Sequence, residues 1–282
     1  MRRIEGFLAR QALLEEVYTS PKPGLVDALS SGAHSDMNVQ TFVRSAYAIA
    51  PYFNVMAQAG EGWEGPLPLL FPQIRAIGMQ AERAMNRATG KVNTHKGLIF
   101  SLGILSTVHG YACRHYAKVE APLLCSLSQA LTYDGLEEDF KYMGKQSLKE
   151  LSHGQQLFVN HQNKGIRGEV QMGFSSVTRY GLPVYQHLMR THQESNRSKL
   201  QVLLHLLSEV EDSNVLFRKG SETLHEVQFT AKELLHFKGA FNNEVVQELA
   251  ELDVSYAQRR ISSGGCADLL AVTLFLDGLT RR

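Results

Sequence analysis

The sequence has few cysteines and no long apolar run. It holds 282 residues with three cysteines, Cys113, Cys125 and Cys266, and no C-x-x-C pair. An odd count without that spacing argues against a disulfide framework or a cysteine zinc site. The apolar stretches are broken by polar residues well short of the ~18 that a membrane span needs. The first residues, MRRIEGFLARQALLEEV, lack the apolar core of a targeting peptide and predict a surface helix. We therefore expect a soluble protein of a reducing compartment, most simply the cytoplasm.

An excess of either charge is also missing. Lys and Arg number 29 against 28 Asp and Glu, a formal net charge of +1, so the chain is a poor candidate for nonspecific nucleic-acid binding. Hydrophobic residues make up 44% and charged residues 20% of the chain, which excludes a mainly disordered protein. A chain of this length can bury a large core without disulfides or metals.

Alternating strand patterns are nearly absent, and helical periodicity dominates. The stretch from Leu98 to Tyr116 is apolar and rich in small residues, so we expect it to be a central buried helix. We predict a single all-α domain over residues 1–282, with loops at 160–175 and 211–220. The predicted helices cover residues 4–19, 39–59, 69–88, 98–116, 121–132, 136–150, 153–160, 182–193, 198–210, 221–237, 240–261 and 266–279.

Several familiar catalytic motifs are missing. There is no Walker A sequence, no H-E-x-x-H and no G-x-S-x-G. Residues 60–65 fit G-x-G-x-x-G, but a predicted helix precedes them and Pro66 and Pro68 follow. A dinucleotide fingerprint needs a strand before it and a helix directly after it. We therefore interpret residues 60–68 as a loop.

Polar residues gather in five stretches beside predicted helix ends. In Ser20-Pro21-Lys22-Pro23-Gly24 the prolines hold Lys22 on a stiff loop, and Asp27, His34 and Asp36 follow closely. In residues 89–97, helix-start N–H groups and the side chains of Asn93, Thr94, His95 and Lys96 suit a phosphate. A capped helix junction is the alternative for both stretches, but four polar groups at the mouth of an apolar helix favour a binding function for residues 89–97.

The other three stretches lie later in the chain. Arg167 and Glu169 stand among glycines, Asp212 and Asn214 precede Arg218, and a serine–glycine turn at 262–265 opens the last helix. If the five stretches gather at one end of the helices, they would form a nucleotide pocket lined by helix N-termini.

These stretches resemble the triphosphoribosyl-dephospho-CoA synthase family, which serves citrate lyase or malonate decarboxylase. The resemblance runs in order from about Leu13 to Leu276. It rests on T-S-P-K-P-G-L-V-D, G-A-H-S-D-M, T-G-K-V-N-T-H-K-G-L-I-F-S-L-G, G-I-R-G-E-V-Q-M-G-F, D-S-N-V-L-F-R-K-G and S-S-G-G-C-A-D-L-L-A. The sequence departs from the family pattern at Ser263, where proline is usual, at Lys91, where glycine is usual, and at Ser213, where threonine is usual. These changes affect loop stiffness more than chemistry.

The resemblance implies an all-α transferase that converts ATP and 3′-dephospho-CoA to 2′-(5″-triphosphoribosyl)-3′-dephospho-CoA and free adenine. The product is the precursor of the prosthetic group of the acyl carrier protein of citrate lyase or malonate decarboxylase. It would pass to a holo-acyl-carrier-protein synthase. The triphosphate should arrive with Mg²⁺, and a homodimer is compatible with this reading.

The implied chemistry calls for cations on the phosphates, a base for the attacking hydroxyl, a carboxylate near the ribose and a donor to adenine. As catalytic residues we expect His34, Asp36 and Glu169. As metal ligands we expect Asp27, Asp36, Glu82 and Asp212. As residues that bind ATP or the acceptor we expect Lys22, Asn93, Thr94, His95, Lys96, Arg167, Asn214, Arg218, Gly264 and Gly265.

Two other classes of function fit the residue types. An all-α, metal-dependent nucleotide phosphohydrolase would use the same Asp, His and Lys loops, but it would release phosphate or pyrophosphate in place of adenine. A helical scaffold for lyase maturation would not bind ATP. The residues do not separate the citrate-lyase branch from the malonate-decarboxylase branch.

Overall fold

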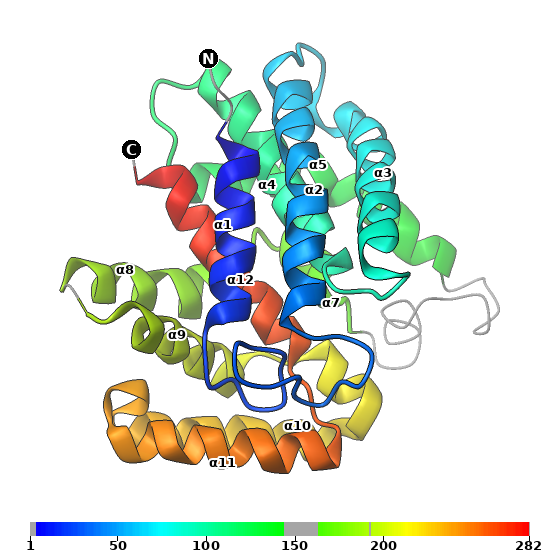
Figure 1. Ribbon diagram of the computed structural model, residues 1–282. Helices are drawn as coiled ribbons and strands as arrows, with labels where there is room; N and C mark the ends of the chain where they lie inside the picture. The colour runs from blue at the N-terminus through cyan, green and yellow to red at the C-terminus, as the bar shows by residue number, and fades with distance from the viewer. Residues whose placement is uncertain (1–3, 144–162, 192, 282) are drawn as a thin grey trace. The chain divides into compact units, whose positions relative to one another are not determined.

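The structure, a computed structural model, describes residues 4–143, 163–191 and 193–281, and within these it contains helices and no strand (Figure 1). The all-α prediction is confirmed. The α-helices are α1 (Glu5–Tyr18), α2 (Val39–Glu61), α3 (Phe71–Thr89), α4 (Lys96–His115), α5 (Ala121–Met143), α7 (Gly165–Gln171), α8 (Leu182–Arg190), α9 (Ser195–Glu209), α10 (Ser213–His236), α11 (Asn243–Arg259) and α12 (Gly264–Thr280). Short helices of other types are η1 (Leu67–Leu70), η3 (Val177–Gly181) and η4 (Gly239–Phe241). In the described part of the chain, none of the helices has the length and apolar character of a membrane span.

The chain forms two compact units, each built from separate segments. The first unit comprises Met1–Arg10, Tyr47–Ser175 and Phe275–Arg282. The second unit comprises Gln11–Ala46 and Ser176–Leu274.

The core of the first unit is α4, which contacts α3 and α5 (Figure 1). Its side chains Leu102, Leu105 and Val108 are fully buried, as the apolar run predicts. Glycines let α2 and α4 approach closely. A Cβ at Gly60 would lie 1.9 Å from the carbonyl oxygen of Thr107, and a Cβ at Gly110 would lie 2.0 Å from that of Ala57. Gly60 is therefore a helix-packing residue, which explains the first glycine of the G-x-G-x-x-G string without a nucleotide.

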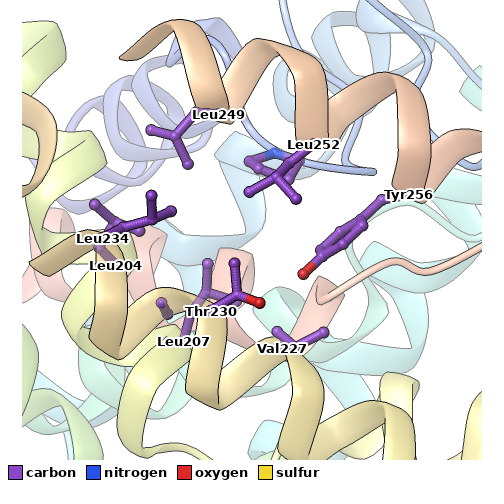
Figure 2. Close-up of a pocket in the computed structure, with 10 residues that line it drawn as sticks. Leu204, Leu207, Val227, Thr230, Leu234, Leu249, Leu252 and Tyr256 are labelled. Atoms are coloured by element: carbon purple, nitrogen blue, oxygen red, sulfur yellow. The ribbon is translucent and has the colours of Figure 1, made fainter. Parts of the chain in front are cut away.

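In the second unit α9 contacts α8 and α10, and η4 contacts α9, α10 and α11. A small cavity lies among α9, α10 and α11 (Figure 2). Leucines from α9 and α11 line it, and the Tyr256 hydroxyl lies near Thr230, with which it makes a hydrogen bond. Because the lining is almost wholly apolar, we treat the cavity as part of the core.

Three predicted boundaries differ from the structure. Residues 121–143 form one helix, because Gly135 packs against Phe71, whose ring carbon would lie 2.6 Å from a Cβ at that position. Helix α7 occupies part of the predicted 160–175 loop. Helix α10 begins at Ser213 because the Asp212 side chain caps it, and Gly220 (φ 83°, ψ 177°) kinks it. The predicted helix at 153–160 lies outside the described residues.

Candidate active site

The Pro-Lys-Pro loop, residues 20–36 of the second unit, is held by two buried carboxylates. The Asp27 carboxylate accepts hydrogen bonds of 2.7–2.9 Å from the backbone N–H groups of Lys22, Leu29 and Ser30. Asp253 of α11 accepts 2.8 Å and 2.6 Å hydrogen bonds from the Gly24 N–H and the Ser30 hydroxyl. The loop is thus fixed both to itself and to a helix far away in sequence.

Lys22 is fully buried in this structure. Its Nζ forms an ion pair with the Glu16 carboxylate and donates a 2.7 Å hydrogen bond to the Glu16 carbonyl. Burial raises the pKa of Glu16, and Asp27 adds to the rise, whereas the nearby Lys22 ammonium opposes it. The structure gives Lys22 the role of tying the loop to α1. Because the Lys22 Nζ is engaged by both the carboxylate and the carbonyl of Glu16, we leave it out of the proposed ligand set.

His34 lies where the loop meets the turn before α12. Its Nε2 lies 3.0 Å from Ser262 Oγ, and its Nδ1 lies 3.9 Å from Asp36 Oδ1. The His34 side chain is 14% exposed and that of Asp36 is 61% exposed. Burial lowers the pKa of His34, and Arg218 lowers it further, while Asp36 opposes both effects. His34 is therefore held in the neutral form that can accept a proton.

Asp212 joins the N-termini of two helices. It caps α10 by accepting hydrogen bonds from the N–H groups of Asn214 (2.8 Å) and Val215 (3.1 Å), and its second oxygen accepts one from Cys266 of α12 (2.8 Å). A Cβ at Gly265 would lie 3.0 Å from this carboxylate. Burial raises the Asp212 pKa, although the backbone hydrogen bonds oppose the rise. Gly264 approaches the Asn214 side chain in the same way, since a Cβ there would lie 3.0 Å from Asn214 Nδ2.

Contacts within the second unit thus bring together three of the five predicted stretches. They also reveal a residue that the sequence reasoning missed. Asp268 is half-buried on α12 and has no hydrogen bond or ion pair with any residue that the structure describes. Burial raises its pKa well above the usual range, and the carboxylates of Glu16 and Asp212 raise it further. The helical spacing of four residues from Gly264 places Asp268 on the same face of α12, a signal that could have identified it.

The other two stretches belong to the first unit. Lys96 Nζ donates a 2.7 Å hydrogen bond to Glu82, which brings a predicted phosphate ligand and a predicted metal ligand together as an ion pair. The Asn93 side chain accepts a 3.2 Å hydrogen bond from the Lys96 N–H. His95 is buried, with its backbone N–H 3.3 Å from Met85 Sδ. Thr94, between Asn93 and His95, is half-buried.

Arg167 and Glu169 lie on α7, which contacts α4 and α5. Both residues are half-buried. Burial lowers the pKa of the Arg167 guanidinium, Asp139 opposes this, and the nearby Arg75 contributes to the lowering. Arg167 remains charged at any pH the protein meets, because an arginine pKa starts far above neutrality.

The predicted metal ligands do not form a metal centre. No three His, Cys, Asp or Glu residues are arranged to hold a metal ion in the part of the chain that the structure describes. The carboxylates of Asp27 and Asp212 accept hydrogen bonds from backbone N–H groups, and Glu82 forms an ion pair with Lys96. The residues present do not fit a resident metal, and we assign no step to one.

Comparison with known proteins gives one consistent result. Residues 3–282 match the family model described as ATP:dephospho-CoA triphosphoribosyl transferase. No solved structure matches the chain.

Relatives in three bacteria carry the name "Probable 2-(5''-triphosphoribosyl)-3'-dephosphocoenzyme-A synthase". The protein of Malonomonas rubra is 36% identical over 269 residues, which cover 95% of this chain and 85% of the relative. That of Vibrio cholerae is 37% identical over 283 residues, covering 99% and 89%. That of Streptococcus equi subsp. equi is 38% identical over 281 residues, covering 95% and 94%. A family match over nearly the whole chain and relatives above 30% identity lead to one conclusion: this chain is a transferase that belongs to the ATP:dephospho-CoA triphosphoribosyl transferase family.

Proposed function

We propose that the protein transfers the 5-triphosphoribosyl group of ATP to the 2′-hydroxyl of 3′-dephospho-CoA and releases adenine. The family match over residues 3–282 carries this proposal. The reaction breaks the bond between C1″ of the ribose and the adenine nitrogen, and it forms a bond between C1″ and the acceptor oxygen. The acceptor hydroxyl loses a proton, and adenine gains one.

The proton chemistry needs an acid and a base at the same pH. Pairs of groups whose surroundings push their pKa values apart supply such a pair. His34, with its lowered pKa, is the base for the acceptor hydroxyl, and Asp268, with its raised pKa, is the donor to the leaving adenine. Asp268 fits this role because its carboxyl group has no protein partner among the described residues.

The triphosphate needs cationic and N–H donors. Arg218 is exposed and makes no hydrogen bond or ion pair with a described residue. Its positive charge is close enough to His34 to lower the pKa of that side chain. We assign Arg218, Asn214 and the N-terminal backbone of α12 at Gly264 and Gly265 to the phosphates, since a helix N-terminus favours anions. Lys96 of the first unit, with half of its side chain exposed, stays a predicted phosphate ligand.

Mg²⁺ enters this scheme as part of the substrate. ATP brings roughly four negative charges, and Mg²⁺ is commonly held by phosphates with few protein ligands.

We further propose that the reaction takes place in the cytoplasm. The product is then the prosthetic-group precursor for the acyl carrier protein of citrate lyase, with malonate decarboxylase as the alternative. A holo-acyl-carrier-protein synthase is the expected next enzyme, and a homodimer is compatible with this proposal. Incubation of the product with each carrier protein and its synthase distinguishes the two branches.

The experiment that tests the reaction is chromatography of the purified protein with ATP, Mg²⁺ and dephospho-CoA. Free adenine and an adduct heavier than dephospho-CoA by one triphosphoribosyl group are expected in equal amounts. Phosphate or pyrophosphate without adenine would instead identify a nucleotide phosphohydrolase. No consumption of ATP would favour a scaffold without catalysis.

A further inference from the structure

The hydrogen bond between His34 and Ser262 restricts what His34 can do as a base. Ser262 is 4% exposed and stands two residues before the start of α12 at Gly264. Its Oγ lies 3.0 Å from His34 Nε2, a normal hydrogen-bond distance. No other partner of this hydroxyl occurs among the described residues. The hydroxyl proton of Ser262 therefore has one acceptor, the Nε2 lone pair.

The other ring nitrogen supports the same tautomer. Nδ1 faces the Asp36 carboxylate at 3.9 Å. This is beyond a direct hydrogen bond, but the negative charge favours a proton on the nearer nitrogen. With the proton on Nδ1, the order of groups is Ser262 O–H, then Nε2 and Nδ1–H of His34, then Asp36. The three groups follow the order of a Ser-His-Asp triad, but Asp36 acts on His34 through its charge and not through a hydrogen bond.

Backbone packing holds the His34 segment against the Ser262 segment. Gly24, at φ 67°, lies so close to the segment before Ser262 that a Cβ would be 2.1 Å from the Ile261 carbonyl oxygen. The Ala33 N–H donates a 3.1 Å hydrogen bond to the Gly24 carbonyl. Ala33, which precedes His34, is thus fixed to Gly24, and Gly24 packs against Ile261, which precedes Ser262.

We infer that Ser262 is a catalytic residue that relays the proton from the acceptor hydroxyl to His34. The inference rests on the proposed function and deepens it. The acceptor 2′-hydroxyl gives its proton to Ser262 Oγ while the Ser262 proton passes to His34 Nε2. The acceptor oxygen forms its bond to C1″ as the bond from C1″ to adenine breaks, and the bond electrons leave with adenine. Ser262 ends as a neutral hydroxyl, and His34 ends as an imidazolium beside Asp36.

Kinetics of four variants test the relay: Ser262→Ala, Ser262→Thr, His34→Gln and the double variant Ser262→Ala/His34→Gln. We expect Ser262→Ala to lower kcat for adenine release by about 10²-fold or more, the typical share of a proton-transfer group, with KM for ATP changed little. Ser262→Thr keeps a hydroxyl and should retain most of the activity. The double variant should be no slower than His34→Gln, because residues that act as a unit are not additive.

Two outcomes would overturn the relay. One is an unchanged kcat in Ser262→Ala. The other is a double variant whose loss equals the product of the two single losses, which would mean that Ser262 and His34 act separately. Melting temperatures of all four variants show whether a slow variant is still folded.

Nitrogen NMR of ¹⁵N-histidine-labelled protein tests the geometry without any substrate. Neutral His34 should carry its proton on Nδ1, and the Nε2 resonance should move in Ser262→Ala. A proton found on Nε2 would overturn the relay even if the enzyme is active. If wild-type protein releases no adenine, the proposed function fails, and this spectrum still decides the Ser262–His34 arrangement.

Discussion

Arg218 differs from Lys22 and Lys96 because it has no carboxylate partner among the described residues. A charged hydrogen bond of this kind contributes about 1.5–3 kcal/mol. We therefore expect Arg218→Ala to lower kcat/KM for ATP by about 10- to 100-fold and to leave the melting temperature unchanged. Lys219→Ala, at the exposed neighbouring position, is the control. Equal losses in both variants would show that general charge matters, and not Arg218.

Gly265 tests the junction of α10 and α12. The backbone at this position is helical, so the cost of a side chain comes from contact with Asp212 and not from strain. We expect Gly265→Val to displace the Asp212 carboxylate and to lower adenine release strongly. Gly278→Ala is the control on the same helix, because its Cβ would lie 3.5 Å from the Leu8 side chain, an ordinary contact. Normal ATP turnover in Gly265→Val would mean that the junction has no part in binding.

The cysteines should differ in their reaction with alkylating reagents. The thiolate is the reactive form, and burial raises the pKa of Cys125 to about 11. Cys266 is fully buried and Cys113 is exposed. Iodoacetamide at pH 8 should therefore modify Cys113 alone in the native protein and all three cysteines in urea, as peptide mass spectrometry can show. Native labelling of Cys125 as fast as Cys113 would contradict this.

At the scale of helices, the close approach of α2 and α4 should contribute to stability. A side chain at Gly110 would meet the Ala57 carbonyl, a backbone atom that cannot turn away. Forced overpacking of this kind costs about 1–3 kcal/mol. We expect Gly110→Ala to lower the free energy of unfolding in urea by this amount. Gly62→Ala, where a Cβ would lie 3.5 Å from the nearest atom, should change it little.

Helices were predictable from the sequence where a long run of apolar residues is buried. The apolar run of α4 is such a local signal. The start of α10 was missed because Gly220 suggested a loop, whereas the Asp212 cap eight residues earlier outweighs one kink. The break expected near Gly135 was wrong because this glycine makes room for Phe71.

Site residues were less predictable, because their partners lie on other helices. The polar stretches marked the right segments, but residue type alone could not show that Lys22 is buried against Glu16. Nor could it show that Asp253, 229 positions from Gly24, holds the Pro-Lys-Pro loop. Ser262 stands within the serine–glycine turn that the sequence analysis singled out, and Asp268 lies three residues beyond that turn. The roles of both depend on distances and surroundings that only the structure supplies.

For the whole molecule, the proposed reaction predicts discrimination between two acceptors. CoA carries a 3′-phosphate beside the attacking 2′-hydroxyl, which dephospho-CoA lacks. Each pair of like unit charges at roughly 6 Å costs about 3 kcal/mol at an effective dielectric constant of 20. We therefore expect CoA to be a poor acceptor and at best a weak inhibitor. Adenine release with each acceptor at equal concentration measures this, and similar turnover would reveal a spare phosphate site.

The make-up of the first unit also bears on how the chain folds as it is synthesised. This unit takes in Met1–Arg10 and Phe275–Arg282 together. Domains generally fold as units during synthesis, the earliest-made residues first. Here residues 1–10 must wait for nearly all of the chain to leave the ribosome before their unit is complete. Bringing together segments so distant in sequence slows folding, so the nascent chain spends most of its synthesis with an unfinished core, the stage at which a chaperone would be of most use.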